Sequence, residues 1–134
     1  MEANIIKLHE TEKSMDFRKK EIIKGYKTIV KKNGLDRTIV DVRFYMGRST
    51  NSSVVYCSVW VHGFNFCGSG VGKAGGWGYH KGSAAMQSAL DDAGIKLDKS
   101  IHGVGESAEL EAIESIMTDM GHPRENYIIA EFYA

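Results

Sequence analysis

The chain has 134 residues, a formal net charge of zero at pH 7, and 43% hydrophobic and 25% charged residues. This length suits one domain, and the composition is that of an ordinary globular protein. The sequence contains no apolar run of about 18 residues to span a membrane, and its start lacks the apolar core of a secretory signal. We therefore expect a single cytoplasmic domain over residues 1–134, loosely ordered over 1–14.

The neutral total hides an uneven distribution of charge along the chain. Residues 1–82 hold 14 Lys and Arg against 7 Asp and Glu, whereas residues 83–134 hold 3 against 10. Such a split indicates either a basic binding face or attraction between the two halves across the fold, and the second interpretation is slightly favoured. Nucleic acid is an allowed partner, but the charge pattern does not require one.

The cysteine and histidine patterns do not indicate a disulfide scaffold or a metal site. Two cysteines are too few for such a scaffold, and the five histidines are scattered singly, with no C-x-x-C, H-x-x-x-H or H-E-x-x-H motif. We expect no metal and no cofactor.

Residues 15–32 carry two competing signals. Apolar residues at helical spacing, among them Ile22 and Tyr26, favour a helix. The pair Asn33-Gly34, followed by an alternating stretch, is instead a hairpin signal. We expect helix early in this segment and strand from about Tyr26.

Two strands with one covered face are predicted next. Residues 38–46 and 53–61 both alternate apolar and polar side chains. A tight turn at His62-Gly63 is then expected to lead into a short strand over 64–67, in a register that places Val61 opposite Phe64.

That register also predicts the role of the cysteines. It puts Cys57 and Cys67 on opposite faces of the hairpin, so a disulfide between them is disfavoured. Cys57 is predicted to be a small buried hydrophobic residue.

Two helices and a last strand are predicted in the remainder of the chain. One helix covers 83–93, between an N-cap at Ser83 and Gly94, the second covers 106–120, and residues 127–133 form a strand. The order is strands, helix, helix, strand. This order indicates an α+β fold, in which a mainly antiparallel sheet of about four to five strands carries both helices on one face.

The segment from Gly63 to Gly82 holds eight of the fifteen glycines. Within it, residues 70–75 match G-x-G-x-x-G, but the next helix begins too late for a dinucleotide-binding turn, and the Walker A spacing is not met. Glycine at this density lets backbone N–H groups approach a ligand closely. The alternative is a flexible connection whose aromatic side chains cover the sheet edge or the core.

The binding interpretation gives each polar or aromatic side chain of this segment a role. Lysine and histidine would neutralise an anion, an aromatic ring would stack on a base, and the amides after Ser83 would hold phosphate at a helix start. The predicted ligand-binding residues are Lys73, Trp77, Tyr79, His80, Lys81 and Ser83.

Catalysis is not favoured by the sequence. Cys57 lies in the middle of a predicted strand, Ser69 lies outside any G-x-S-x-G turn, and no two carboxylates are spaced for acid–base chemistry. His80 with the nearby Ser83 is the remaining candidate pair, and nothing in the sequence places them in contact. We assign no catalytic residue.

The C-terminal half carries a pattern of G-x-G-Y-x-K-x-S-A-A, a short helix, and G-V-G before a second helix. The matching residues are Gly76, Gly78, Tyr79, Lys81, Ser83, Ala84 and Ala85, then Gly103, Val104 and Gly105. This pattern resembles a family of small uncharacterised proteins carried by phages and plasmids. The resemblance implies a counter-defence role in the host cytoplasm, through a nucleotide signal or a defence protein, and it assigns no functional residue.

Three functional hypotheses follow. The first is non-enzymatic binding of a nucleotide-like or phosphate-bearing ligand through the glycine-rich loop 70–83, in a monomer or a homo-oligomer. The second is direct protein–protein inhibition of a host defence complex, as anti-CRISPR proteins do, through the basic N-terminal half or the acidic helix 106–120. The third is a small nucleotide hydrolase.

Overall fold

The computed structural model describes residues 4–9, 20–47, 54–63, 68–75, 81–96 and 105–133. Its strands are β1 (Asn4–His9), β2 (Lys20–Lys32), β3 (Leu35–Gly47), β4 (Val54–Val61), β5 (Gly68–Gly75) and β6 (Tyr127–Tyr133). Its helices are α1 (Lys81–Asp92) and α2 (Glu106–Asp119), and a 3₁₀ turn, η2 (Arg124–Asn126), precedes β6.

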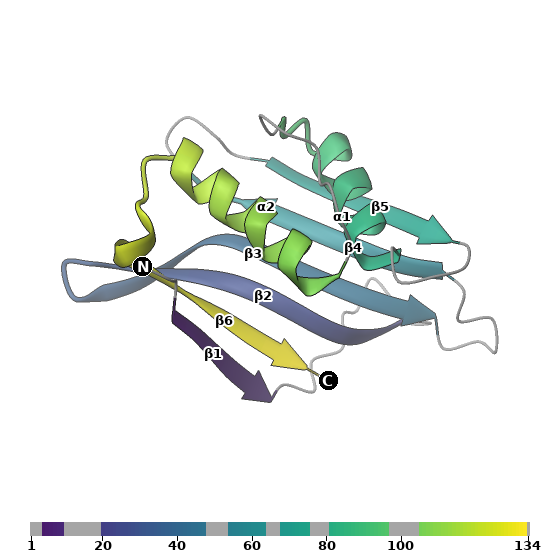
Figure 1. The fold of residues 1–134 in the computed structure, drawn as a ribbon, viewed down its shortest axis with the longest axis horizontal. Helices are drawn as coiled ribbons and strands as arrows, with labels where there is room; N and C mark the ends of the chain where they lie inside the picture. The colour runs from purple at the N-terminus through teal and green to yellow at the C-terminus, as the bar shows by residue number, and fades with distance from the viewer. Residues whose placement is uncertain are drawn as a thin grey trace.

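The strands form one sheet in the order β1-β6-β2-β3-β4-β5 (Figure 1). Its neighbouring strands are antiparallel, except that β1 and β6 are parallel. The predicted α+β class and mainly antiparallel sheet are confirmed. The described sheet has six strands, more than expected, and its spatial order departs from the chain order because β6 lies between β1 and β2.

A tight hairpin joins β2 to β3, as the Asn33-Gly34 pair predicts. Both residues have positive φ, 54° and 77°, which a two-residue turn between twisted strands requires. The helix expected early in this region is wrong at Ile22, which lies in β2, whereas the strand expected from about Tyr26 is confirmed. Pairing of β2 with β3 on one side and β6 on the other overrides the helical spacing of its apolar residues. Residues 15–19 lie outside the described part.

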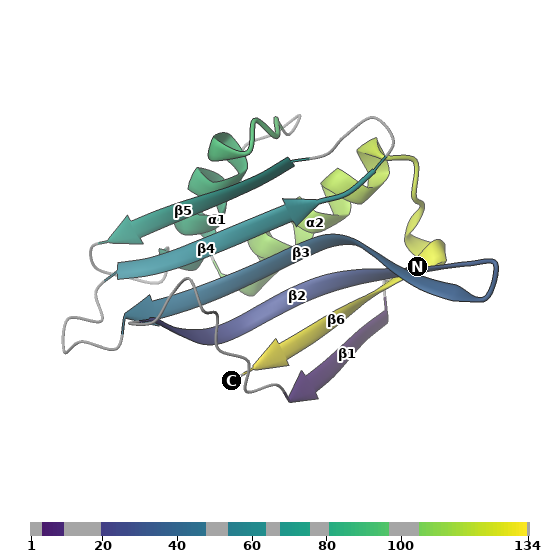
Figure 2. The same cartoon turned by 180° about the vertical axis from the view of Figure 1, so that it is seen from behind.

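Both helices pack on one face of the sheet, and Figure 2 shows the other face without a helix. The sheet side of this core alternates along β3 and β4 as predicted. Its residues are Val40, Val42 and Phe44 from β3, and Val55, Cys57, Val59 and Val61 from β4. The helices contribute Ala85, Met86, Ala89 and Leu90 from α1, and Ile113, Ile116 and Met117 from α2. Neither described helix has the length and hydropathy needed to cross a membrane.

The predicted register after β4 is wrong. Val61 lies opposite Gly68, not Phe64, because the strand that pairs with β4 is β5. The glycines of β5 allow α1 to pack directly against this strand, a packing that the apolar side chains of 64–67 did not suggest. Residues 64–67, Cys67 among them, lie outside the described part. Cys57 is a buried free cysteine, as predicted.

Candidate functional site

The glycine-rich segment is a regular strand over Gly68–Gly75. A Cβ atom at Gly70 would lie 2.3 Å from the Ala89 carbonyl oxygen of α1, and one at Gly72 would lie 2.4 Å from that of Ala85. No side chain fits there, because real Cβ atoms do not approach backbone oxygens this closely. These two glycines therefore serve helix-on-strand packing, so this part of the segment is neither an open loop nor a flexible connection.

The predicted binding residues divide between two faces of the sheet. Lys73 is exposed on β5 opposite Tyr56, on the face turned away from α1. Lys81 is the first residue of α1, and Ser83 in the first turn of that helix is buried, with 4% of its surface exposed. Trp77, Tyr79 and His80 lie outside the described residues.

The carboxylate of Glu109 lies beside the start of α1. Glu109, in the first turn of α2, is 1% exposed and accepts hydrogen bonds from Lys24 Nζ (2.5 Å) and Tyr26 Oη (2.8 Å). Its other oxygen lies 2.6 Å from the position that a Cβ at Gly82 would take. Because a helix start attracts negative charge, Glu109 already complements this end of α1. An anionic ligand at Ser83 would share the site with this carboxylate.

Two groups near Glu109, the Tyr26 hydroxyl and the Cys57 thiol, are held in their neutral forms. Burial, followed by the nearby charge of Glu109, raises the pKa of the Tyr26 hydroxyl far above its usual range, so Tyr26 remains a hydrogen-bond donor. Burial also raises the pKa of the Cys57 thiol. Since the thiolate is the nucleophilic form, Cys57 is a packing residue and not a nucleophile.

A second carboxylate, Glu131 on β6, is 1% exposed. Its Oε1 accepts the hydroxyl of Tyr133, while its Oε2 is buried without a hydrogen-bond partner. The hydrogen bond to Glu131 is the main cause that raises the pKa of Tyr133 to about 12.

This hydrogen bond predicts a loss of stability at high pH. Below pH 10 the Tyr133 phenol is protonated in both the folded and unfolded states, so its contribution is fully present. Between about pH 10 and about pH 12 only the unfolded state loses this proton, so stability falls as pH rises. Urea unfolding at pH 9 and pH 11 measures the fall, which we expect to be smaller in Tyr133→Phe. An equal fall in that variant would contradict the assignment.

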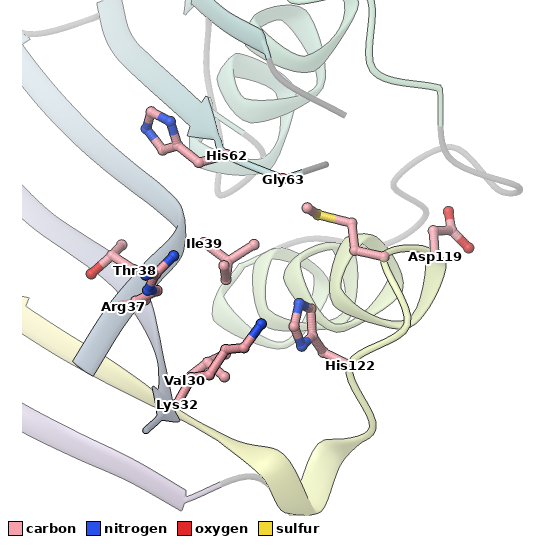
Figure 3. Close-up of a pocket in the computed structure, with 10 residues that line it drawn as sticks. Val30, Lys32, Arg37, Thr38, Ile39, His62, Gly63, Asp119 and His122 are labelled. Atoms are coloured by element: carbon pink, nitrogen blue, oxygen red, sulfur yellow. The ribbon is translucent and has the colours of Figure 1, made fainter. Parts of the chain in front are cut away.

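A pocket of about 660 Å³ lies beside the β2–β3 hairpin, at the opposite end of α2 from Glu109 (Figure 3). Its walls come from the hairpin, the end of β4 and the C-terminal end of α2. The lining residues are Val30, Lys32, Arg37, Thr38, Ile39, His62, Gly63, Asp119, Met120 and His122. This volume is in the range of small-molecule sites, and the lining combines apolar side chains with a few cationic ones.

An irregularity in the β2–β3 ladder places Arg37 in this pocket. The register shifts between the pairs Lys27–Asp41 and Ile29–Thr38, so that Arg37 lies opposite Val30. Directly opposed residues share a face, and a bulge turns the side chains beyond it to the other face. Arg37 therefore joins Val30 and Lys32 on the pocket side, although strict alternation with Asp41 and Arg43 would put it on the helix-free face.

The end of α2 fixes the imidazole on the other wall. Gly121 has φ 84°, its N–H donates to the Thr118 carbonyl, and the N–H of His122 donates to that of Met117. This pair of bonds is a Schellman cap, which satisfies the last carbonyls of the helix. It holds His122 where Figure 3 shows its ring facing Lys32.

Sequence reasoning missed this pocket for two reasons. The bulge leaves no mark in the alternation of residues 38–46, and His122 stands alone in the sequence, far from the hairpin. The available signals were the Asn33-Gly34 turn, which brings Lys32 and Arg37 together across two strands, and Gly121, which marks the cap before His122.

The described residues contain no group of three or more His, Cys, Asp or Glu side chains suited to a metal ion. In comparisons with known proteins, no family model, no curated protein and no solved structure matches this chain.

Proposed function

We propose that this protein binds a small phosphate-bearing ligand of nucleotide type without reacting with it, and that the ligand lies in the pocket beside the β2–β3 hairpin. The observation that carries this proposal is the joint placement of Lys32, Arg37 and His122 around one hollow of about 660 Å³. Arg presents a planar fork of donors that matches phosphate oxygens, and Lys adds a compact positive charge.

The remaining walls suit the rest of a nucleotide. Val30, Ile39 and Met120 supply apolar surface for a base or sugar. The Asp119 carboxylate points away from Lys32 and His122 in Figure 3, so the lining close to these two residues is cationic and apolar. This arrangement favours an anion over a cation in the pocket.

The counter-defence role implied by the phage and plasmid resemblance belongs to this proposal, and it sets the choice of probes. A thermal-shift screen should use AMP, ATP, cyclic di-AMP and cyclic di-GMP, with inorganic phosphate and pyrophosphate to measure the phosphate contribution alone. A ligand at 100 times its Kd adds about 2.7 kcal/mol to the free energy of unfolding. If no probe raises the melting temperature, the proposal is wrong.

Variants of the pocket test where the ligand lies. We expect Arg37→Ala and His122→Ala each to weaken binding of the best probe about tenfold by calorimetric titration, because each removes a charged or polar contact to phosphate. Arg37→Lys should retain part of the affinity.

Lys73→Ala is the matched control for these variants. Lys73 is an exposed lysine on β5, outside the pocket, and it belongs to the predicted loop site. If the ligand lies in the hairpin pocket, Lys73→Ala should bind the best probe as tightly as the unaltered protein does. If Lys73→Ala weakens binding and Arg37→Ala does not, the ligand lies at the glycine-rich segment and the α1 start instead.

The structure gives less support to a docking role for the acidic helix. Glu109 is buried against Lys24, and Glu114 pairs with Arg124 at 2.9 Å. These two acidic side chains of α2 are therefore engaged in ion pairs within the chain. Glu106, Glu111 and Asp119 remain exposed on α2. Three separated carboxylates make a weak surface for a basic partner.

A further inference from the structure

Strand β5 forms an outer edge of the sheet that the described residues build (Figure 2). The N–H of Val71 donates to Asp92 Oδ2 of α1 at 3.1 Å, so it points away from β4. Backbone groups alternate in direction along a strand, so those of Ser69 and Lys73 point the same way. All three residues are exposed. The edge thus presents a row of donors and acceptors, which is a template for another strand.

Apolar surface adjoins this edge on the helix-free face. The side chains of Trp60 and Val71 are 50% and 49% exposed. They are diagonal neighbours on that face, because Trp60 lies opposite Ser69, two residues before Val71. The Trp60 ring also lies nearly parallel to that of His62, with centroids 6.4 Å apart.

Negative charge adjoins the edge on the helix side. Asp91 and Asp92 are exposed at the end of α1, and the last turn of that helix has no basic residue. The carbonyl end of a helix adds a partial negative charge at the same place. Cations are therefore favoured on this side of the edge.

We propose that the edge of β5 binds an extended segment of a partner protein as an added strand with alternating apolar and basic side chains. Neighbouring side chains of a strand point to opposite faces, so the apolar ones lie toward Val71 and Trp60 and the Lys or Arg ones toward Asp92. A carbonyl of the partner replaces Asp92 as the acceptor of the Val71 N–H, and the released carboxylate pairs with a basic side chain of the partner.

The probe for this inference is a capped nine-residue peptide that alternates Val and Lys, labelled for fluorescence anisotropy. We expect it to bind at low salt, and we expect the same peptide with Glu for Lys to bind at least tenfold more weakly. A copy N-methylated on the amides that face β5 should not bind, because it cannot form the new ladder. If the Val–Lys peptide fails to bind, or if the N-methylated copy binds equally well, the proposal is wrong.

Variants and amide exchange locate the bound peptide. Val71→Pro removes an N–H that β4 does not use, a change that edge strands tolerate, and should abolish binding. Asp92→Asn should weaken binding about fivefold at low salt, while Asp36→Asn, which removes an exposed charge on β3, should not.

Amide exchange of the unaltered protein tests the site independently of any variant. The peptide should slow exchange at Ser69, Val71 and Lys73. Protection confined to other strands would overturn the inference. So would self-association that protects these amides without peptide, because the occupant of the edge would then be a second copy of this chain.

Discussion

Gly72→Ala is expected to lower the free energy of unfolding by about 3 kcal/mol. The new Cβ would lie 2.3 Å from the Ala89 nitrogen and 2.4 Å from the Ala85 carbonyl oxygen, both of which are backbone atoms of α1. Neither atom can move without the helix, so α1 must shift away from the sheet and loosen its contacts with the core. Urea unfolding monitored by circular dichroism measures the change.

The same strand offers a matched control. Val71 is the next residue before Gly72, and its half-exposed side chain points to the face without helices. We expect Val71→Ala to change the free energy of unfolding by less than about 1 kcal/mol. If Gly72→Ala costs no more than this control, the glycine does not serve close packing of α1, and the ligand-binding interpretation of the segment gains support.

Several elements of this fold are predictable from local sequence patterns. The alternation along β3 and β4, the positive-φ turn at Asn33-Gly34, and the bounds of α2 and β6 follow from the sequence, because each depends on neighbours a few residues apart. Glycine is disfavoured in strands and marks loops, so the sequence predicts the wrong structure for β5. The reason for its glycines is visible only once α1 lies against them.

The candidate site is less predictable, because its contacts join distant parts of the chain. Glu109 meets Lys24 and Tyr26, residues more than eighty positions earlier, and no periodicity links them. Arg37 reaches the pocket through a bulge that the sequence does not mark, and His122 comes from the far end of α2. The predicted ligand class is retained in our proposal, but its place in the fold is different.

Breaking the buried pair Lys24–Glu109 is the second change with a large expected effect. Glu109→Ala should lower the free energy of unfolding by about 4 kcal/mol, because it leaves a mostly buried ammonium and the Tyr26 hydroxyl without their shared acceptor. Lys24→Met should cost a similar amount, since a carboxylate with 1% exposure then loses its cation. Chemical denaturation of each variant at pH 7 measures both losses.

The double variant separates the ion pair from simple loss of packing. Lys24→Met with Glu109→Gln removes both charges and keeps similar volumes, so its cost should fall short of the summed costs of Lys24→Met alone and Glu109→Gln alone by about 1–3 kcal/mol. The partly exposed Asp41–Arg43 pair is the control, and Asp41→Asn there should cost less than about 1 kcal/mol. Additive costs at Lys24 and Glu109 would mean that the two charges are not coupled. In that case Glu109 would not be held beside the start of α1 by Lys24. The region around Ser83 would then be the better candidate for the phosphate-binding site.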